Sequence, residues 1–427
     1  MQAEHLLSLA TQSGAAVAEV YQASARSQPA FFEANRLKQL ESSESLGTAL
    51  RLWCQGRPGL AVAYGDFEPA QLVEKAVALA QLNASEPIEL AAAARATFPT
   101  LGATVPVEVL VEQGRSAIAN LRDQYPEILC SAELECETAT TLLLNSRGLH
   151  CTTADISLSA WLGAEWVRGE NFLGIYEDEE ARDRLAVPDL AAAIAQRLDW
   201  AKTNVSAPTG RIPVIFTRKA AGLLWSAIEA ATNGKRLVEQ ASPWSDSLGQ
   251  RLLDPALTLR QVPDFGPYSC PIDDEGTPTQ AFDLIRAGEF VQPYCDRVTG
   301  RQLQQASTGN GFRPSLDRYP TPSLINLCVE PGTGDLYSLI GSLDRALLVD
   351  QVLGGGPDLS GDFSVNVDLG YCIERGAVVG RVKDTMLAGN VYTALADEVV
   401  LAGDRAWQGS YYTPAVLVNG LSVTTQS

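Results

Sequence analysis

The chain has 427 residues, of which 46% are hydrophobic, and a formal net charge of −19 at pH 7. Its length exceeds that of one ordinary core, so two or three domains are expected. The negative charge disfavours direct contact with nucleic acid or anionic membranes, and no apolar run approaches the roughly 18 residues of a membrane span. The N-terminus lacks the basic and apolar regions of a signal peptide, so we expect a cytoplasmic location.

The first 210 residues predict two α/β units. The first unit, residues 1–85, is expected to contain a helix over 3–14, strands over 18–26, 29–35, 37–43, 47–55 and 59–64, and a helix over 69–83. An Ala-rich, Pro-bounded linker covers 86–105. The second unit, residues 106–210, is expected to contain a helix over 106–125, strands over 128–137, 140–145, 148–162 and 165–174, and a helix over 190–202. The repeated order is compatible with a structural duplication at a period of about 100 residues.

Residues 211–427 predict a third, β-rich domain. It opens with an apolar strand over 211–217 and a helix over 218–232. Short β-like runs separated by Gly and Pro follow, which is typical of an antiparallel curled sheet or barrel. These runs cover 281–287, 289–294, 323–329, 346–351, 364–374, 377–382 and 414–419. The fold class is therefore α+β.

Few residues are available for metal or nucleophile chemistry. The only histidines are His5 and His150, and neither has a second His or a Cys at zinc-site spacing apart from Cys151. Cys151 is adjacent to His150 and would face the opposite side of a strand, so the two would not bind one metal ion together. The eight cysteines form no CxxC pair and are expected to be isolated, mostly buried thiols. A serine or cysteine nucleophile would need a nearby base, and no GxSxG motif is present.

Several short motifs occur in a characteristic order. They are Val20-Tyr21, the strand pair 41–51, the run 144–149 (LNSRGL), the segment 273–278 (DDEGTP), the run 308–311 (TGNG), the run 354–364 (GGGPDLSGDFS) and 373–376 (IERG) before Val382-Lys383. Together they resemble the TldD/PmbA family over nearly the whole chain. Members of that family form soluble zinc-dependent peptidase complexes and have also been called modulators of DNA gyrase.

The resemblance implies that this chain lacks the zinc site of the family. TldD-type subunits carry an HExxxH motif on the helix that opens the C-terminal domain, with a cysteine further on. There zinc would polarise a peptide carbonyl and activate water, with the Glu as general base. Here Trp225, Ser226 and Ala230 occupy the His, Glu and His places, and the cysteine position falls near Ala402. This pattern resembles the PmbA (TldE) branch, so no catalytic residue and no metal is expected in this chain, and Trp225 would fill the space of the metal.

The same resemblance suggests a peptide-binding cleft. Its candidate residues are Asp273, Asp274, Glu275, Gly276, Thr308, Gly309, Asn310, Gly311, Arg313, Gly354, Gly355 and Gly356. The acidic triplet 273–275 has two interpretations: a site for a hard cation, or, favoured here, a turn in which a carboxylate caps backbone amides and Gly276 supplies an unusual dihedral. Arg313 could pair with a carboxylate.

Two further segments have simple interpretations. The glycines 354–356 are interpreted as a turn that allows close backbone approach rather than an anion cradle, and a peptide could add there as a strand. The acidic run 177–183 is interpreted as a solvated loop.

These observations predict a non-catalytic PmbA/TldE-like subunit of a cytoplasmic TldD/TldE-type metallopeptidase. It would pair through its β-rich half with a zinc-bearing TldD-type homologue and help to enclose a peptide substrate. The alternative is a stand-alone homodimer that binds peptides or another ligand in a degenerate cleft. A third hypothesis places chemistry on carboxylates around Asp273 and Asp296. No nucleic-acid or membrane partner is expected.

Overall fold

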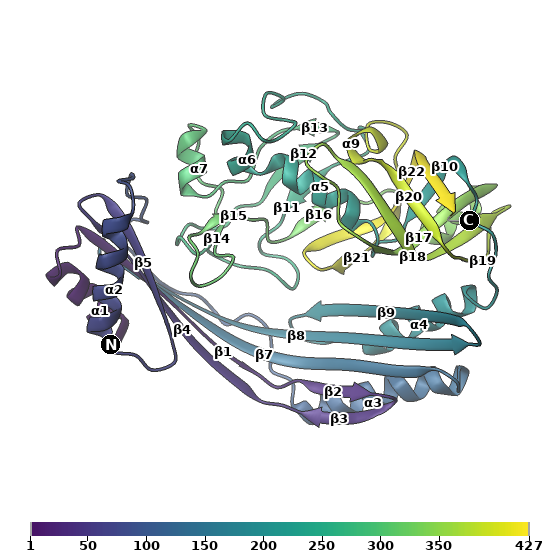
Figure 1. Ribbon diagram of the computed structural model, residues 1–427, viewed down its shortest axis with the longest axis horizontal. Helices are drawn as coiled ribbons and strands as arrows, with labels where there is room; N and C mark the ends of the chain where they lie inside the picture. The colour runs from purple at the N-terminus through teal and green to yellow at the C-terminus, as the bar shows by residue number, and fades with distance from the viewer. Residues whose placement is uncertain (1, 426–427) are drawn as a thin grey trace.

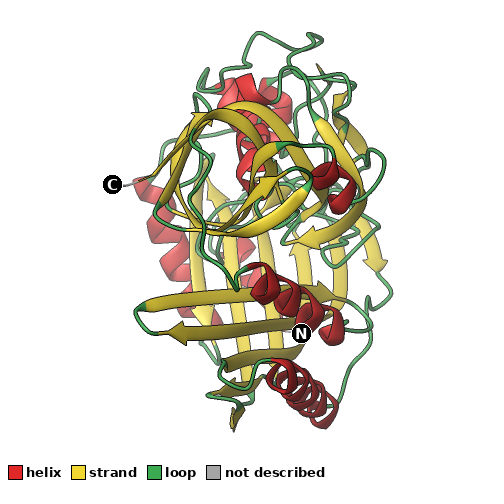
Figure 2. Ribbon diagram, turned by 90° about the vertical axis from the view of Figure 1, so that its right-hand side faces the viewer, coloured by secondary structure: helices red, strands yellow, loops and turns green. Residues whose placement is uncertain are grey.

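The structure is a computed structural model that describes residues 2–425. It has an N-terminal sheet covered by helices and a β-rich C-terminal domain that lies above this sheet (Figures 1 and 2). The fold is α+β, as predicted from the sequence. None of the helices in the described residues is both long and apolar enough to cross a membrane.

The N-terminal part forms one large, almost entirely antiparallel sheet. Its strands are β1 (Val17–Ser27), β2 (Ala30–Glu33), β3 (Arg36–Leu40), β4 (Ser43–Cys54), β5 (Arg57–Tyr64), β6 (Ala94–Thr97), β7 (Leu129–Asn145), β8 (Leu149–Arg168) and β9 (Asn171–Ala181). The strand order is β3-β2-β7-β1-β4-β5, and β8 extends the sheet from β7 to β9 and β6. Because β1 pairs with both β4 and β7, the two expected α/β units share one sheet. The duplication itself stays a prediction.

Four helices cover the apolar face of this sheet: α1 (Gln2–Gln12), α2 (Pro69–Leu82), α3 (Val107–Gln124) and α4 (Val187–Trp200). One apolar cluster joins α1 and α2 to β1, β4 and β5. A second cluster joins α3 and α4 to β7, β8 and β9 and continues into strands of the C-terminal domain. Helix α4 therefore packs against both parts of the molecule. Burial of this apolar surface is the main contribution that holds them together.

Three features of the long strands differ from the predictions. The expected boundary between strands 148–162 and 165–174 is wrong, because β8 continues to Arg168 and the hairpin turn lies at residues 169–170. The expected strands 128–137 and 140–145 are one strand, β7, because the intervening residues Thr138 and Ala139 do not interrupt a β conformation. The expectation of a solvated loop at 177–183 is wrong. Strand β9 continues to Ala181, and Glu177 is only 4% exposed because it lies on the buried face with Leu173 and Ile175.

The C-terminal domain is built on a barrel. Its strands are β10 (Gly210–Phe216), β11 (Leu259–Gln261), β12 (Phe282–Arg286), β13 (Glu289–Phe290), β14 (Gly311–Phe312), β15 (Thr321–Pro322), β16 (Leu327–Val329), β17 (Arg345–Leu353), β18 (Asp362–Glu374), β19 (Ala377–Val382), β20 (Thr385–Asn390), β21 (Val400–Gln408) and β22 (Tyr411–Thr425). Its helices are α5 (Gly222–Thr232), α6 (Gly234–Val238), α7 (Arg297–Gln302), α8 (Leu336–Gly341) and α9 (Val391–Ala394).

Five strands close the barrel in the order β10, β17, β18, β20, β22 and back to β10. The β10–β17 pair is parallel and the others are antiparallel, so the barrel is mixed. Its core combines barrel residues such as Phe216 and Val349 with Trp225 and Ile228 of α5. The predicted β-rich domain of curled-sheet or barrel type is confirmed as a barrel, and α5 belongs to its core.

Side chains of the C-terminal domain cover the free edge of β9. Within residues 2–425, β9 pairs only with β8. The Gln351 amide accepts from Tyr176 N at 3.3 Å and donates to Gly174 O at 3.4 Å. Lys219 donates to Tyr176 O, and Arg381 donates to Phe172 O. These contacts satisfy edge groups that would otherwise be open to another strand.

All eight cysteines lie within the described residues and are unpaired. Six of them are buried, and only Cys54 and Cys270 are half-buried. The expectation of isolated, mostly buried thiols is confirmed.

Candidate functional site

Helix α5 gives the three residues at the expected zinc positions different surroundings. Trp225 is completely buried, and its indole Nε1 donates to Thr413 Oγ1 at 2.7 Å. Ser226 is half-buried, and its hydroxyl donates to Leu223 O within the helix at 3.0 Å. Ala230 has only a methyl group, and the same is true of the buried Ala402 on β21. Trp225 thus packs in the barrel core and does not line an open cleft.

The glycine segment 354–356 passes close to α5. It joins β17 to β18 and is exposed. A Cβ at Gly356 would lie 3.9 Å from Ser226 Oγ, so the fold brings these two candidate positions together. Gly354 has a φ of +124°, which side-chain-bearing residues rarely adopt. The interpretation as a glycine-dependent turn therefore fits the backbone.

Beside these positions lies a carboxylate that the sequence analysis missed. Glu229 of α5 accepts from the Tyr411 hydroxyl at 2.6 Å, and the Tyr294 hydroxyl donates to Glu229 O at 3.1 Å. Burial raises the pKa of Glu229. The available signal was a single carboxylate in the otherwise apolar helix GLLWSAIEAAT.

The acidic triplet forms a turn that holds a second loop. Asp273 Oδ1 accepts from Glu275 N at 3.0 Å and from Thr277 N at 2.8 Å, while its Oδ2 accepts from Gly311 N at 2.9 Å. Gly276 has a φ of +75°. This geometry is that of the favoured turn: a carboxylate caps amides and glycine supplies the left-handed conformation.

The other two carboxylates of the triplet also bind backbone amides. Asp274 Oδ2 accepts from Arg313 N, and Glu275 Oε2 accepts from Arg297 N, both at 2.8 Å. Burial raises the pKa of Asp273 to about 7, against the effect of its amide donors. Burial together with the Asp273 charge raises the pKa of Glu275 to about 8. Asp296, the other carboxylate of the third hypothesis, caps α7 by accepting from Thr299 N at 2.7 Å.

The loop 308–311 is a packed structural element. Thr308 Oγ1 donates to Asn310 Oδ1 at 2.7 Å, and Asn310 Nδ2 donates to Gln261 Oε1 at 2.7 Å. Gly309 has a φ of +73°, and a Cβ there would collide with the carbonyl of Pro278. These residues fix the loop against the turn 273–278.

Arg313 links this loop to the N-terminal sheet. Its Nη2 lies 3.1 Å from Glu19 Oε1 of β1, and Arg51 Nη2 of β4 lies 2.9 Å from the same oxygen. All three side chains are buried, so this charge cluster is well protected from solvent screening. The carboxylate partner expected for Arg313 is therefore Glu19, in the other part of the molecule.

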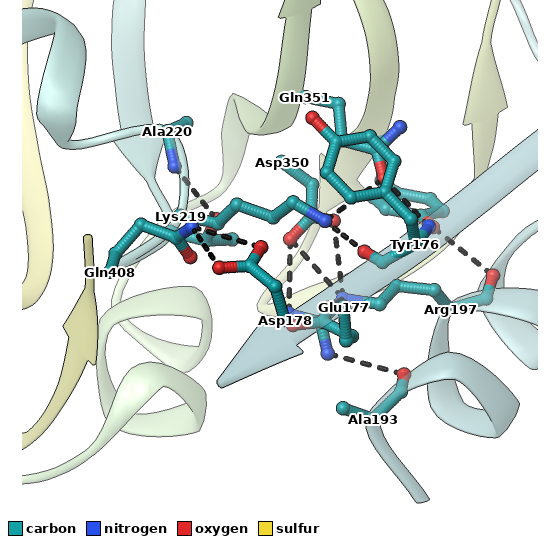
Figure 3. A network of polar contacts seen from close by, with 12 residues as sticks. Tyr176, Glu177, Asp178, Ala193, Arg197, Lys219, Ala220, Asp350, Gln351 and Gln408 are labelled. Carbon is teal, nitrogen blue, oxygen red and sulfur yellow. Dashed lines mark hydrogen bonds and ion pairs between the residues drawn. The ribbon is translucent and has the colours of Figure 1, made fainter. Parts of the chain in front are cut away.

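A second charge cluster links the same two parts farther along the sheet (Figure 3). Arg197 of α4 lies 3.2 Å from Glu177 of β9 and 3.1 Å from Asp350 of β17. Lys219, in the segment before α5, donates to Gln351 Oε1 at 3.3 Å and to Tyr176 O. This cluster was not predicted from the sequence, because its members are dispersed along the chain.

A cavity of about 370 Å³ lies between the sheet and the C-terminal domain. Its sheet side includes Tyr21 and Thr153, and its other side includes Tyr268, Cys270 and Asp274. The glycines 354–356 and the α5 positions do not line it. The candidate cleft residues thus fall in two places: the turn and loop beside the cavity, and the glycine segment beside α5.

The pattern of the chain matches one family of known proteins. A family model described as the PmbA/TldA metallopeptidase C-terminal domain matches residues 209–425, about half of the chain, and a model of domain 1 of the same family matches residues 18–80. The chain belongs to the PmbA/TldD metallopeptidase family. The recognition of the family from sequence motifs is confirmed.

Relatives from both branches of the family match. A metalloprotease TldD homolog of Haemophilus influenzae is 30% identical over 194 residues, which are 44% of this chain and 39% of that protein. Metalloprotease PmbA of Escherichia coli O157:H7 is 25% identical over 291 residues, which are 66% of this chain and 62% of that protein. The matched part thus spans less than two thirds of these curated relatives, and their names do not assign a branch.

A solved structure supports the fold over the full length. The crystal structure of TldE from Thermococcus kodakarensis has a TM-score of 0.91 and 24% sequence identity, and the match covers 99% of this chain and 100% of that one. At this identity the similarity concerns the fold alone.

The residues expected at the family's zinc positions do not fit a zinc ion. Zinc is bound by Cys sulfur, His nitrogen or carboxylate oxygen in near-tetrahedral geometry. The indole of Trp225 is a donor already bound to Thr413, the Ser226 hydroxyl is bound within its helix, and Ala230 has no ligand atom. Across residues 2–425, no group of three or more His, Cys, Asp or Glu side chains is arranged to hold a metal ion.

Proposed function

We propose that this chain is a non-catalytic, TldE-like subunit of a cytoplasmic TldD/TldE-type peptidase. The observation that carries the proposal is that Trp225 packs in the barrel core. The sequence resemblance aligns this residue with the first zinc ligand of a TldD-type subunit. A metal there would require the largest side chain of α5 to leave the core. Hydrolysis is therefore assigned to a zinc-bearing partner of the TldD type.

In this proposal the chain contributes binding surface and no reacting group. The exposed glycine segment 354–356 offers backbone groups without side-chain obstruction, which suits pairing with an extended peptide. The turn 273–277 and the loop 308–313 hold each other rigid, which suits a wall of a binding site. Their carboxylates already accept from backbone amides, so they are assigned a structural role.

Native mass spectrometry with metal analysis tests the proposal. The chain is measured alone and mixed with a TldD-type homologue from the same organism. We expect a one-to-one complex with zinc only in the partner, and peptide cleavage only by the complex. Stoichiometric zinc in this chain alone, with cleavage that a chelator stops, would overturn the proposal. A metal-free self-dimer that ignores the homologue would support the stand-alone binding protein instead.

A pair of matched variants tests where the chemistry lies. Replacing the glutamate of the partner's HExxxH motif by glutamine is expected to abolish turnover by the complex, because that residue is the general base of the zinc site. Ser226→Ala, at the equivalent place in this chain, is expected to leave kcat unchanged. A large loss of kcat in Ser226→Ala, with the complex intact, would place chemistry in this chain.

A further inference from the structure

The face of the N-terminal sheet that is opposite to the helices carries an aromatic hollow near the β8–β9 hairpin. Trp161, Gly163 and Glu165 follow each other along one face of β8. In the antiparallel register, Gly163 is opposite Tyr176 and Glu165 is opposite Gly174. Directly opposite residues share a face, so these side chains surround one area. The hollow has a volume of about 210 Å³.

Three aromatic rings form the walls of this hollow, and all three are accessible to solvent. Trp161 is 40%, Phe172 57% and Tyr176 38% exposed. Exposed aromatic side chains that converge on one hollow are unusual for a surface with no binding role. The residues on the opposite face of the same strands, such as Leu162 and Ile175, are buried under the helices.

Glycines set the positions of two of the rings. A Cβ at Gly163 would lie 2.6 Å from the Trp161 ring, so that ring lies over the bare backbone of Gly163. A Cβ at Gly174 would be 3.5 Å from the Phe172 ring. No positive φ requires glycine at either position. The space that the two rings occupy, rather than the backbone conformation, therefore explains why a residue without a side chain is found at each position.

The electrostatic surroundings of the hollow are acidic. The carboxylates of Glu165 and Asp368 line it, and Asp368 also accepts from Gln351 Nε2 at 3.2 Å. Burial raises the pKa of Tyr176, and the charges of neighbouring carboxylates, Asp178 and Asp368 first among them, raise it further. Carboxylates thus lie close to the ring.

The nearest cations are already paired. Lys219 Nζ lies 3.4 Å from the centre of the Tyr176 ring and belongs to the charge cluster of Figure 3, where Glu177 and Asp350 balance Lys219 and Arg197. Arg168 stacks on Trp166 and donates to backbone carbonyls after α4, so it lies on the helix side of the sheet. Arg381 donates to Phe172 O and lies near Asp368. Around the hollow, the carboxylates of Glu165, Asp178 and Asp368 therefore face Arg381 and the paired Lys219.

We propose that Trp161, Phe172 and Tyr176, with Glu165 and Asp368, form a cage for the head of an organic cation, either a quaternary ammonium or a guanidinium group. A cation over an aromatic face is attracted by the ring quadrupole, and aromatic cages with few hydrogen-bond donors favour weakly hydrated cations. Lys219 already makes such a contact with Tyr176, so a ligand cation would use the part of that ring that Lys219 leaves exposed. The inference concerns the isolated chain and is independent of the proposed peptidase subunit.

Matched pairs of probes test the charge requirement. Choline is compared with its neutral carbon isostere dimethylbutanol, and N-acetylarginine amide is compared with N-acetylcitrulline amide. Binding is measured by ligand-detected NMR at an ionic strength of about 0.15 M, which screens the overall negative charge beyond roughly 8 Å. We expect one or both cations to bind and both neutral probes to bind at least about fivefold more weakly. Preference for choline indicates a free small cation, and preference for the arginine derivative indicates an arginine side chain of a polypeptide.

Three variants test the location of the cage. Trp161→Ala removes a wall, Glu165→Gln removes a charge, and Gly163→Ala pushes the Trp161 ring away with only one added methyl group. Each is expected to weaken cation binding about fivefold, the factor for one cation–π or screened ionic contact. Tyr64→Ala and Glu127→Gln change an exposed ring and an exposed carboxylate elsewhere, and both are expected to leave binding unchanged.

The outcomes are distinct. Equal binding of the charged and neutral probes would mean that the hollow is only an apolar surface, and it would overturn the proposal. The same holds if the control variants weaken binding as much as Trp161→Ala and Gly163→Ala do. Thermal unfolding of each variant shows whether it is folded, and Glu165→Gln still tests the cage if a change near the ring disturbs the sheet.

Discussion

The charge cluster of Figure 3 predicts a large effect from one substitution, Arg197→Met. The Arg197, Glu177 and Asp350 side chains are 9%, 5% and 0% exposed, and both ion pairs are close to 3 Å. Methionine keeps most of the side-chain volume but leaves the two buried carboxylates with one cation, Lys219, in place of two. Removal of one partner of a buried ion pair costs about 3–5 kcal/mol. We therefore expect the free energy of unfolding to fall by about that amount.

The pH dependence of the penalty is a further part of this prediction. Burial acts to raise the pKa of Asp350, but the Arg197 guanidinium outweighs it and holds this pKa below its usual range. A carboxyl group whose pKa is depressed in the folded state stabilises the fold at pH values above its unfolded pKa of about 3.9. This stabilisation is lost as the pH falls through the folded pKa. In Arg197→Met the depression is gone, and protonation relieves the buried charges. The difference between wild type and variant should therefore shrink as pH falls from about 7 to about 5.

The assay is urea denaturation followed by both tryptophan fluorescence and circular dichroism, because coincident curves are needed to define one free energy of unfolding. Lys202→Met is the control, since its ion pair with Asp199 is exposed and such pairs contribute about 0–1 kcal/mol. Combining Arg197→Met with Glu177→Gln should recover much of the loss, because Asp350 and Lys219 then remain as a balanced pair. A penalty in Arg197→Met no larger than in the control, or one that grows at low pH, would refute the reasoning.

Two other predictions follow from buried groups of the C-terminal domain. Burial and the Asp273 charge raise the pKa of Glu275 to about 8. The contribution of Glu275 to stability is therefore fully present below the unfolded pKa of about 4.3 and is lost as pH rises to about 8. Glu275→Gln should flatten this pH dependence of the free energy of unfolding, measured by urea unfolding at several pH values, and an unchanged slope would assign the pH dependence to another group. Trp225→Ala should lower the free energy of unfolding by about 3–5 kcal/mol because the ring fills the barrel core, whereas the exposed Trp161→Ala should cost far less, and equal costs would mean that Trp225 is not a core residue.

Local patterns explain why much of the fold could be predicted. The alternation along β7 and β8 and the apolar stripes of α2 and α3 depend on neighbouring residues, and the expected elements lie where these patterns are. Closure of the barrel depends on β10 pairing with β22, which joins Gly210 to Val423. No local signal specifies such a distant partner. The sequence therefore predicted a curled sheet or barrel without distinguishing the two.

The same distinction applies to the candidate site. The turn at 273–277 was predicted because Asp273 caps amides within four residues of itself. The burial of Glu177 was not predicted, because composition alone cannot show that an acidic run has a buried arginine partner 20 residues later and a neighbouring carboxylate, Asp350, far beyond it. The hollow on the sheet was missed for a similar reason, since Trp161 and Tyr176 meet only through the β8–β9 register.

The capped edge of β9 has a consequence for the order of events during translation. The strand is complete at Ala181, but the residues that cover its edge, Lys219, Gln351 and Arg381, are synthesised later. At about 5–20 residues per second, the last of them follows the strand by at least about ten seconds. During that interval the nascent sheet presents an unpaired edge beside the emerging barrel strands. Truncation between β9 and β10 would remove all three covering residues and leave the edge open permanently.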